Sequence, residues 1–228
     1  NRDSLLVQTP ESLKARFNLD VRPFHEVIQI SPEEHTVTVR HDGQEFTENY
    51  NKLILSPGAK PFVPVIEGLA EAKNTYTLRN VPDLDEIMAA LDKHPKEAVV
   101  IGAGFIGLEM AENLAKRGLH VTIVEKAPHI LPPLDQEMAA FVQAELVKNS
   151  VRVITSQSAT RFEEQGKIIV LENGQKITSD LTILSVGVEP ENGLAKAAGI
   201  ELGLRGGILV DEHYETSQKD IFAVGDAI

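Results

Sequence analysis

A short run of glycines between an apolar segment and an amphipathic segment constrains this chain more than any other feature. Gly102, Gly104 and Gly107 form a G-x-G-x-x-G pattern directly after the apolar residues 98–101. Residues 105–117 then carry apolar side chains at helical spacing and are followed by a further glycine. The pattern therefore predicts a strand, a tight turn and a helix in immediate succession.

Each glycine has a separate physical task in such a turn. The first permits the sharp change from strand to helix, the second lets the backbone approach a pyrophosphate, and the third lets the helix pack closely on the sheet. Free amides at the helix start, together with the helix dipole, attract phosphate groups. We therefore expect a dinucleotide-binding loop that comprises Gly102, Ala103, Gly104, Phe105, Ile106 and Gly107.

An acidic residue lies at the position where dinucleotide-binding folds bind the ribose. Glu125 ends the next strand pattern, 120–124, about 20 residues after the first glycine. A carboxylate there accepts both hydroxyls of a ribose and repels a 2′-phosphate, so it favours NAD(H) over NADP(H). The neighbouring Lys126 would weaken that discrimination, and a solvated strand end is the structural alternative for Glu125.

The middle of the chain alternates between strand and helix patterns. Strand patterns at 98–101, 120–124 and 151–154 are separated by helix patterns at 105–117 and 135–148. This alternation predicts an α/β fold in which a parallel sheet has helices on its faces. Shorter strands are expected at 53–55, 168–171, 176–178 and 181–184, the second and third joined through Asn173-Gly174.

The first quarter of the chain reads as a small antiparallel unit. A two-turn helix is expected after Thr9, followed by strands around Val27 and Val37 and by a hairpin turn at Asp42-Gly43. The proline-containing residues 56–69 show no period and are interpreted as a linker.

A helix is predicted to open at Val81. Asp83, Asp85 and Glu86 lie near its start, where carboxylates complement the helix dipole. We favour this structural role over a catalytic pair of carboxylates.

Composition excludes several classes of function. The 228 residues carry 22 Lys and Arg against 34 Asp and Glu, a formal charge of −12, which argues against a nucleic-acid partner. No apolar run reaches the ~20 residues of a membrane span, so no membrane partner is expected. There is no cysteine, which is compatible with a cytoplasmic location, and the seven histidines lack metal-ligand spacing, so no metal site is expected.

Five ordered motifs resemble one family closely. They are residues 53–59 (LILSPGA), 102–112 (GAGFIGLEMAE), 185–191 (SVGVEPE), 205–208 (RGGI) and 220–226 (DIFAVGD). Together they resemble the FAD- and NAD-linked pyridine nucleotide-disulfide oxidoreductases. Within these they resemble the subgroup of CoA-disulfide reductases, NADH oxidases and NADH-dependent persulfide reductases.

The resemblance implies a Rossmann-like NAD(P)-binding domain inserted in a discontinuous, truncated FAD-binding domain. Residues 1–78 and 203–228 would belong to the FAD-binding domain and residues 79–202 to the NAD-binding domain. The redox cysteine would lie upstream of these residues and a dimerisation domain downstream, so this chain would be an inactive internal fragment of a homodimeric enzyme.

The resemblance also implies further cofactor contacts. Asp226 would hold the ribityl hydroxyls of FAD, Gly58 would pass close to the flavin nucleotide, and Val27 would contact the adenine through its backbone. Glu109 and Gly187 would lie near the nicotinamide, although a helix-surface carboxylate and a strand-end turn are the structural alternatives.

The implied activity is transfer of hydride from NADH through FAD to a disulfide, CoA-disulfide, persulfide or O₂ acceptor. Two alternatives remain open at this point. One is an NADH-dependent flavin reductase of a ferredoxin, rubredoxin or nitrite reductase system, and the other is a non-catalytic NAD-binding module.

Overall fold

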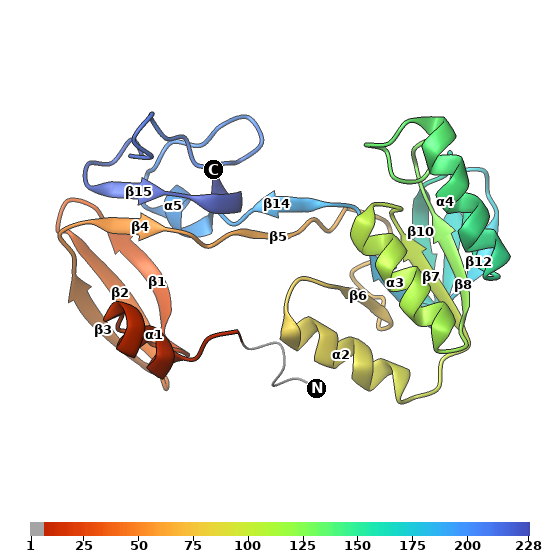
Figure 1. Cartoon of the computed structure of the whole chain (residues 1–228), viewed down its shortest axis with the longest axis horizontal. Coiled ribbons are helices and arrows are strands. Elements are labelled where there is room, and N and C mark those ends of the chain that lie inside the picture. Colours follow the sequence, from red (N-terminus) through yellow and green to blue (C-terminus); the bar gives the residue numbers. More distant parts are fainter. Residues whose placement is uncertain (1–6) are drawn as a thin grey trace. The chain divides into compact units, whose positions relative to one another are not determined.

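The computed structural model describes residues 7–228, which form two compact units (Figure 1). The first unit consists of the described residues up to Ala59 together with Pro190–Ile228. The second unit is Lys60–Glu189. The chain leaves the first unit within β5 (Ala59–Pro61) and returns to it within β14 (Val188–Pro190), and these two strands pair with each other.

A five-stranded sheet in the order β6-β13-β7-β8-β9 is the centre of the second unit, and its neighbouring strands are parallel. Its strands are β6 (Thr75–Thr77), β7 (Glu97–Ile101), β8 (His120–Val124), β9 (Arg152–Ile154) and β13 (Leu181–Leu184). The prediction of a parallel sheet is confirmed. Because β7, β8 and β13 are almost wholly buried, they carry apolar side chains on both faces.

Helices cover one face of this sheet. They are α2 (Val81–Leu91), α3 (Phe105–Lys116) and α4 (Gln136–Lys148). Val100 and Ile183 of the sheet share one buried cluster with Ile87 of α2, Leu114 of α3 and Ala139 of α4. Helices were predicted at all three places, and each is confirmed.

An antiparallel sheet covers the opposite face. It contains β10 (Ala159–Glu163), β11 (Ile168–Leu171) and β12 (Lys176–Thr178), with the short helix η2 (Glu164–Gly166) between the first two strands. Val99 and Ile101 alternate with the helix-facing residues of β7 and pack here against Phe162 and Ile169. The Asn173-Gly174 turn joins β11 to β12 as predicted.

The first unit combines an antiparallel sheet with a short parallel pair. Strands β1 (Glu26–Ser31), β2 (Thr36–His41) and β3 (Gln44–Asn49) form the former, and β4 (Leu53–Leu55) and β15 (Ile221–Ala223) form the latter. The remaining elements are α1 (Pro10–Phe17), α5 (Gly193–Ala197) and η3 (Gly225–Ala227). Ile30, Val39, Ile221 and Ala223 belong to one buried cluster that holds this unit together.

The boundaries of the compact units differ from the predicted ones at 78/79 and 202/203. Residues 60–78 belong to the second unit because β6 pairs with β13 and Leu69 is buried against the antiparallel sheet. The segment predicted as a linker, 56–69, contains the boundary between the two units, and of its residues only Ala59 and Leu69 are buried. Residues 190–202 belong to the first unit, where Ala195 and Ile200 are buried.

The acidic start of α2 has the structural role predicted for Asp83. Its carboxylate accepts hydrogen bonds from the backbone N–H groups of Arg79 (2.7 Å) and Asn80 (3.1 Å), and the Asn80 side chain accepts one from the Asp83 N–H (3.0 Å). This is a capping box with the helix start between its two members. Within residues 7–228 no helix is long and apolar enough to cross a bilayer.

Candidate dinucleotide site

The carboxyl ends of three parallel strands bring the site together. Gly102, Glu125 and Ser185 directly follow β7, β8 and β13. The N–H of Gly102 donates to the Val124 carbonyl and the N–H of Ser185 to the Ile101 carbonyl, both at 2.8 Å, so the sheet pairing continues past the strand ends. Ligands of open α/β sheets bind at this edge.

The glycine loop has the conformation that its sequence predicts. Gly102 has φ +101°, and a Cβ there would lie 2.2 Å from the Ser185 carbonyl oxygen. A Cβ on Gly107 would lie 2.1 Å from the Gly102 carbonyl oxygen, which shows how closely α3 approaches the turn. A Cβ on Gly104 would meet no atom within 4 Å, so this residue borders open space.

The start of α3 offers backbone donors to that space. Gly104 is the N-cap residue, and no side chain caps the helix. The first helical hydrogen bond runs from the Leu108 N–H to the Gly104 carbonyl (3.0 Å), so the amides of Phe105, Ile106 and Gly107 precede it. Phe105 and Ile106 are 65% and 48% exposed, so both residues are accessible at this helix start.

Glu125 is buried beside the glycine loop, with 8% of its surface exposed. One carboxylate oxygen (Oε2) accepts a hydrogen bond from the N–H of Ala103 at 2.6 Å, and the other (Oε1) accepts one from the N–H of Ala127 at 2.7 Å. A carboxylate has about four acceptor positions. Each oxygen therefore retains capacity for one further donor.

Residues of the glycine loop and Glu125 line one cavity of about 540 Å³, the dinucleotide cavity. Of the predicted cofactor-binding residues it contains Gly102, Gly104, Glu125 and Gly187. The other lining residues were not among the predicted cofactor contacts; they are Phe62, Pro64, Ile66, Ile101, Val124, Lys126, Pro132, Gln157, Ser158, Ala159, Ser185 and Val186. Ser185 was within reach of sequence reasoning, because it follows a buried strand that ends at the same edge.

Glu109 lies elsewhere in the second unit. It is exposed on α3 and lines a different cavity of about 560 Å³, between α3 and α4, together with Glu112 and Glu145. Phe105 of the glycine loop also lines this cavity, whereas Gly102, Gly104 and Glu125 line the other one. The predicted place of Glu109 near the nicotinamide stays a prediction.

The other three predicted residues, Val27, Gly58 and Asp226, belong to the first unit. Gly58, with φ +74°, follows β4, and Asp226 follows β15, so both stand beyond the carboxyl ends of one parallel pair. The Val224 N–H donates to the Leu55 carbonyl (3.0 Å), which continues that pairing. Val27 lies on β1 and is 36% exposed.

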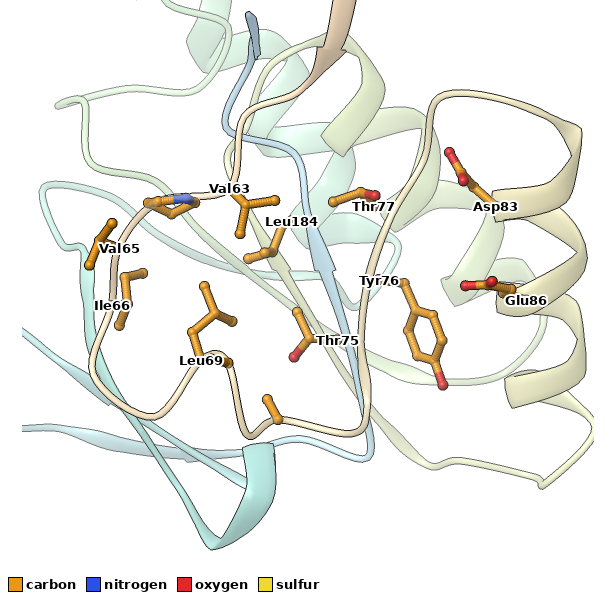
Figure 2. A pocket seen from close by; sticks show the side chains of 13 residues that line it. Val63, Val65, Ile66, Leu69, Thr75, Tyr76, Thr77, Asp83, Glu86 and Leu184 are labelled. Carbon is orange, nitrogen blue, oxygen red and sulfur yellow. The ribbon is translucent and has the colours of Figure 1, made fainter. Parts of the chain in front are cut away.

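A further cavity of about 470 Å³ adjoins the dinucleotide cavity, and the two share Pro64 and Ile66. Figure 2 shows aliphatic side chains such as Leu69 and Leu184 lining it, with Asp83 and Glu86 projecting from α2. The Asp83 carboxylate is already committed to the helix cap. Among residues 7–228 no group of three or more His, Cys, Asp or Glu side chains could hold a metal ion.

The family model described as pyridine nucleotide-disulphide oxidoreductase matches residues 5–228. The chain belongs to this family. The family resemblance drawn from the five sequence motifs is therefore confirmed.

Two curated relatives match 99% of the chain. The NADH oxidase of Methanocaldococcus jannaschii is 37% identical, and the coenzyme A disulfide reductase of Staphylococcus aureus (strain JH9) is 36% identical. The chain spans about half (51%) of the length of each.

Solved structures agree with this placement. Reduced Bacillus anthracis CoADR-RHD has a TM-score of 0.96 at 49% identity, over 100% of this chain and 42% of that one. The water-forming NADH oxidase of Lactobacillus brevis, solved with NADH, has a TM-score of 0.88 at 28% identity, over 100% of this chain and 50% of that one. An engineered form of it that acts as an NADPH oxidase, solved with NADPH, has a TM-score of 0.90 at 26% identity, over 100% of this chain and 51% of that one.

Proposed function

We propose that this chain is the pyridine-nucleotide-binding part, with a portion of the FAD-binding part, of a flavoprotein that oxidises NADH. The observation that carries the proposal is the cavity lined both by Glu125 and by Gly104, the N-cap residue of α3, which no side chain caps. When bound, NADH supplies a hydride, and FAD accepts it and passes electrons on to the final acceptor.

The residues of the second unit would divide the binding between them. The backbone at Gly104, Phe105 and Ile106 would hold the pyrophosphate, because its amides are free of helical partners and no Cβ fills the space at Gly104. Glu125 would accept the two ribose hydroxyls with its remaining lone pairs. Gly187 lines the same cavity, and because a Cβ there would meet nothing within 4 Å it would leave room for the nicotinamide.

The preference for NADH over NADPH rests on Glu125. A buried carboxylate at the ribose would face the 2′-phosphate of NADPH at close range, and two like charges there repel strongly. The engineered Lactobacillus brevis enzyme supports this. Three of its five substitutions fall at a glycine, at an aspartate eighteen residues later and at a proline a further seven residues on, and Gly107, Glu125 and Pro132 have the same separations here. Another substitution places an arginine directly after the aspartate, where this chain has Lys126, so Lys126 would oppose part of the preference.

The FAD contacts would come from the first unit. Gly58 and Asp226 stand beyond neighbouring parallel strands, an arrangement that suits a nucleotide cofactor. Val27 would contribute backbone groups from β1. Residues 60–189 would then be the NAD-binding domain, and the first unit would be the portion of the FAD-binding domain that this chain contains.

The acceptor is proposed from the relatives. Their names point to coenzyme A disulfide and to O₂ that is reduced to water, and the named persulfide reductase of A. fulgidus adds persulfides. The chain contains no cysteine, so a thiol that reacts with such an acceptor would belong to residues outside this sequence. In the whole protein we expect a homodimer.

Calorimetric titration tests the proposal. We expect saturable binding of NADH, with NADPH binding at least tenfold more weakly because of the charge on Glu125. Glu125→Ala should weaken NADH binding and narrow the difference between the two nucleotides. Glu112→Gln is the matched control, because Glu112 is exposed on α3 and forms an ion pair with Lys116 on the same helix.

Two results would contradict the proposal. Failure of the folded protein to bind either nucleotide would remove the dinucleotide site, and tighter binding of NADPH than of NADH would remove the assigned role of Glu125. A non-catalytic NAD-binding module is the second candidate. Turnover of NADH with added FAD by the longer protein would exclude it.

A further inference from the structure

Ala103, at the centre of the glycine loop, is held at both ends of its backbone by the segment that follows β8. Its N–H donates to Glu125 at 2.6 Å, and its carbonyl accepts from the N–H of Leu131 at 2.9 Å. Ala103 itself is fully buried. The two peptide planes between Gly102 and Gly104 therefore have their orientation fixed by residues 125–131.

Leu131, which donates to the Ala103 carbonyl, has an unusual backbone conformation. It has φ +47°, in the left-handed region that a branched side chain such as leucine rarely adopts. The side chain is 5% exposed, so packing holds the residue in place. Strained backbone of this kind is retained where the surrounding structure uses it.

The Ala127 N–H completes the arrangement. It donates to the second oxygen of Glu125 at 2.7 Å, so that the carboxylate is fixed at both oxygens and cannot rotate. The Ala127 carbonyl in turn accepts from the N–H of Ser156 at 2.9 Å, which ties the segment to the residues after β9.

We propose that residues 125–131 form a clamp that holds the glycine loop ready for a pyrophosphate, with Glu125 as a positioning residue for that group in addition to its contact with the ribose. This rests on the proposed dinucleotide site and goes beyond it. Glu125 would then influence a ligand that has no ribose at all.

For pyrophosphate binding to Glu125→Gln, simple charge repulsion and the clamp predict opposite changes in affinity. Removal of a negative charge beside a dianionic or trianionic ligand should strengthen binding. A clamp predicts weaker binding, because both oxygens of Glu125 face N–H donors. In Glu125→Gln either orientation of the side-chain amide places its NH₂ group against one of them.

The test is a titration of the 228-residue chain with inorganic pyrophosphate, followed by NMR. Glu125→Gln and Glu125→Asp are compared with the wild type, and Glu112→Gln is the control. The aspartate keeps the charge but is one methylene too short to reach both amides. We expect pyrophosphate affinity to fall roughly two- to tenfold in both Glu125 variants, the loss that corresponds to one hydrogen bond, and to stay unchanged in the control.

Hydrogen exchange of the Ala103 amide gives a second measurement that needs no ligand. It should quicken in both Glu125 variants, while amides in the middle of β8 keep their protection. Unchanged or tighter pyrophosphate binding in either folded variant overturns the clamp, and so does unchanged exchange at Ala103. If the clamp is overturned but the wild type binds NADH, the proposed function stands. If the wild type binds neither NADH nor pyrophosphate, the proposed function fails, and exchange at Ala103 still decides the clamp.

Discussion

Alanine in place of Gly102 should destabilise the second unit through two separate effects. The residue has φ +101°, which costs a non-glycine residue about 1–3 kcal/mol. The new Cβ would also lie 2.2 Å from the Ser185 carbonyl oxygen and 2.7 Å from its carbon, so β7 and β13 must move apart. Overpacking of this kind costs about 1–3 kcal/mol. The sum is about 2–6 kcal/mol, a large part of the stability of a typical domain.

Gly174→Ala is the matched control in the same unit. Gly174 has φ +81°, and a Cβ there meets nothing within 4 Å, so only the backbone cost applies. Equilibrium unfolding in urea, followed by far-ultraviolet circular dichroism, measures both variants, and it reports mainly on the second unit because α2, α3 and α4 lie there. Gly102→Ala should be about 1–3 kcal/mol less stable than the control. Equal destabilisation of the two variants would refute the close approach of Ser185.

Two further predictions concern stability. Asn80→Ala removes the cap of α2 and should lower the free energy of unfolding in urea by about 0.5–2 kcal/mol. Thr9→Ala should lower it far less, because α1 buries no residue. Equal losses of stability in the two variants would contradict this prediction. Hydrogen bonds from the backbone N–H groups of Glu97 and Lys96 lower the pKa of Asp180. Its stabilising effect is therefore present above the unfolded-state pKa of about 3.9 and lost as the pH falls below it. Asp180→Ala should lower the urea midpoint at pH 7, and its difference from the wild type should narrow as the pH falls below about 3.9, whereas a constant difference would disprove the linkage.

The sequence predicted those parts of the fold whose signal is local. The apolar runs of β7, β8 and β13 and the helical spacing after Gly104 can be read from consecutive residues, and all were found. Strand β6 was missed because Thr75–Thr77 has no apolar run, and its identity depends on pairing with β13 about a hundred residues later. The pairing of β6 with β13 also places residues 60–78 in the second compact unit.

In the candidate site, too, the residues with a local sequence signal were predicted and those placed by tertiary structure were not. Gly102, Gly104 and Glu125 were identified from the motif and its spacing, and they line one cavity with Gly187. The double hydrogen bond of Glu125 could not be predicted, because it depends on how the chain turns at Ala127 and where β8 lies beside the glycine loop. Pro132 reaches the cavity through the same tertiary arrangement.

The most direct test of the central claim is to map NADH on the protein by NMR. On addition of NADH we expect the amide signals of residues 102–107, of Glu125 and of residues 185–187 to shift together and to saturate. Signals at the middle of α4 should stay unchanged. Shifts confined to residues outside these segments, such as Glu112, Glu145 and Leu146 in the cavity between α3 and α4, would show that the nucleotide binds elsewhere and would contradict the assignment of the glycine loop.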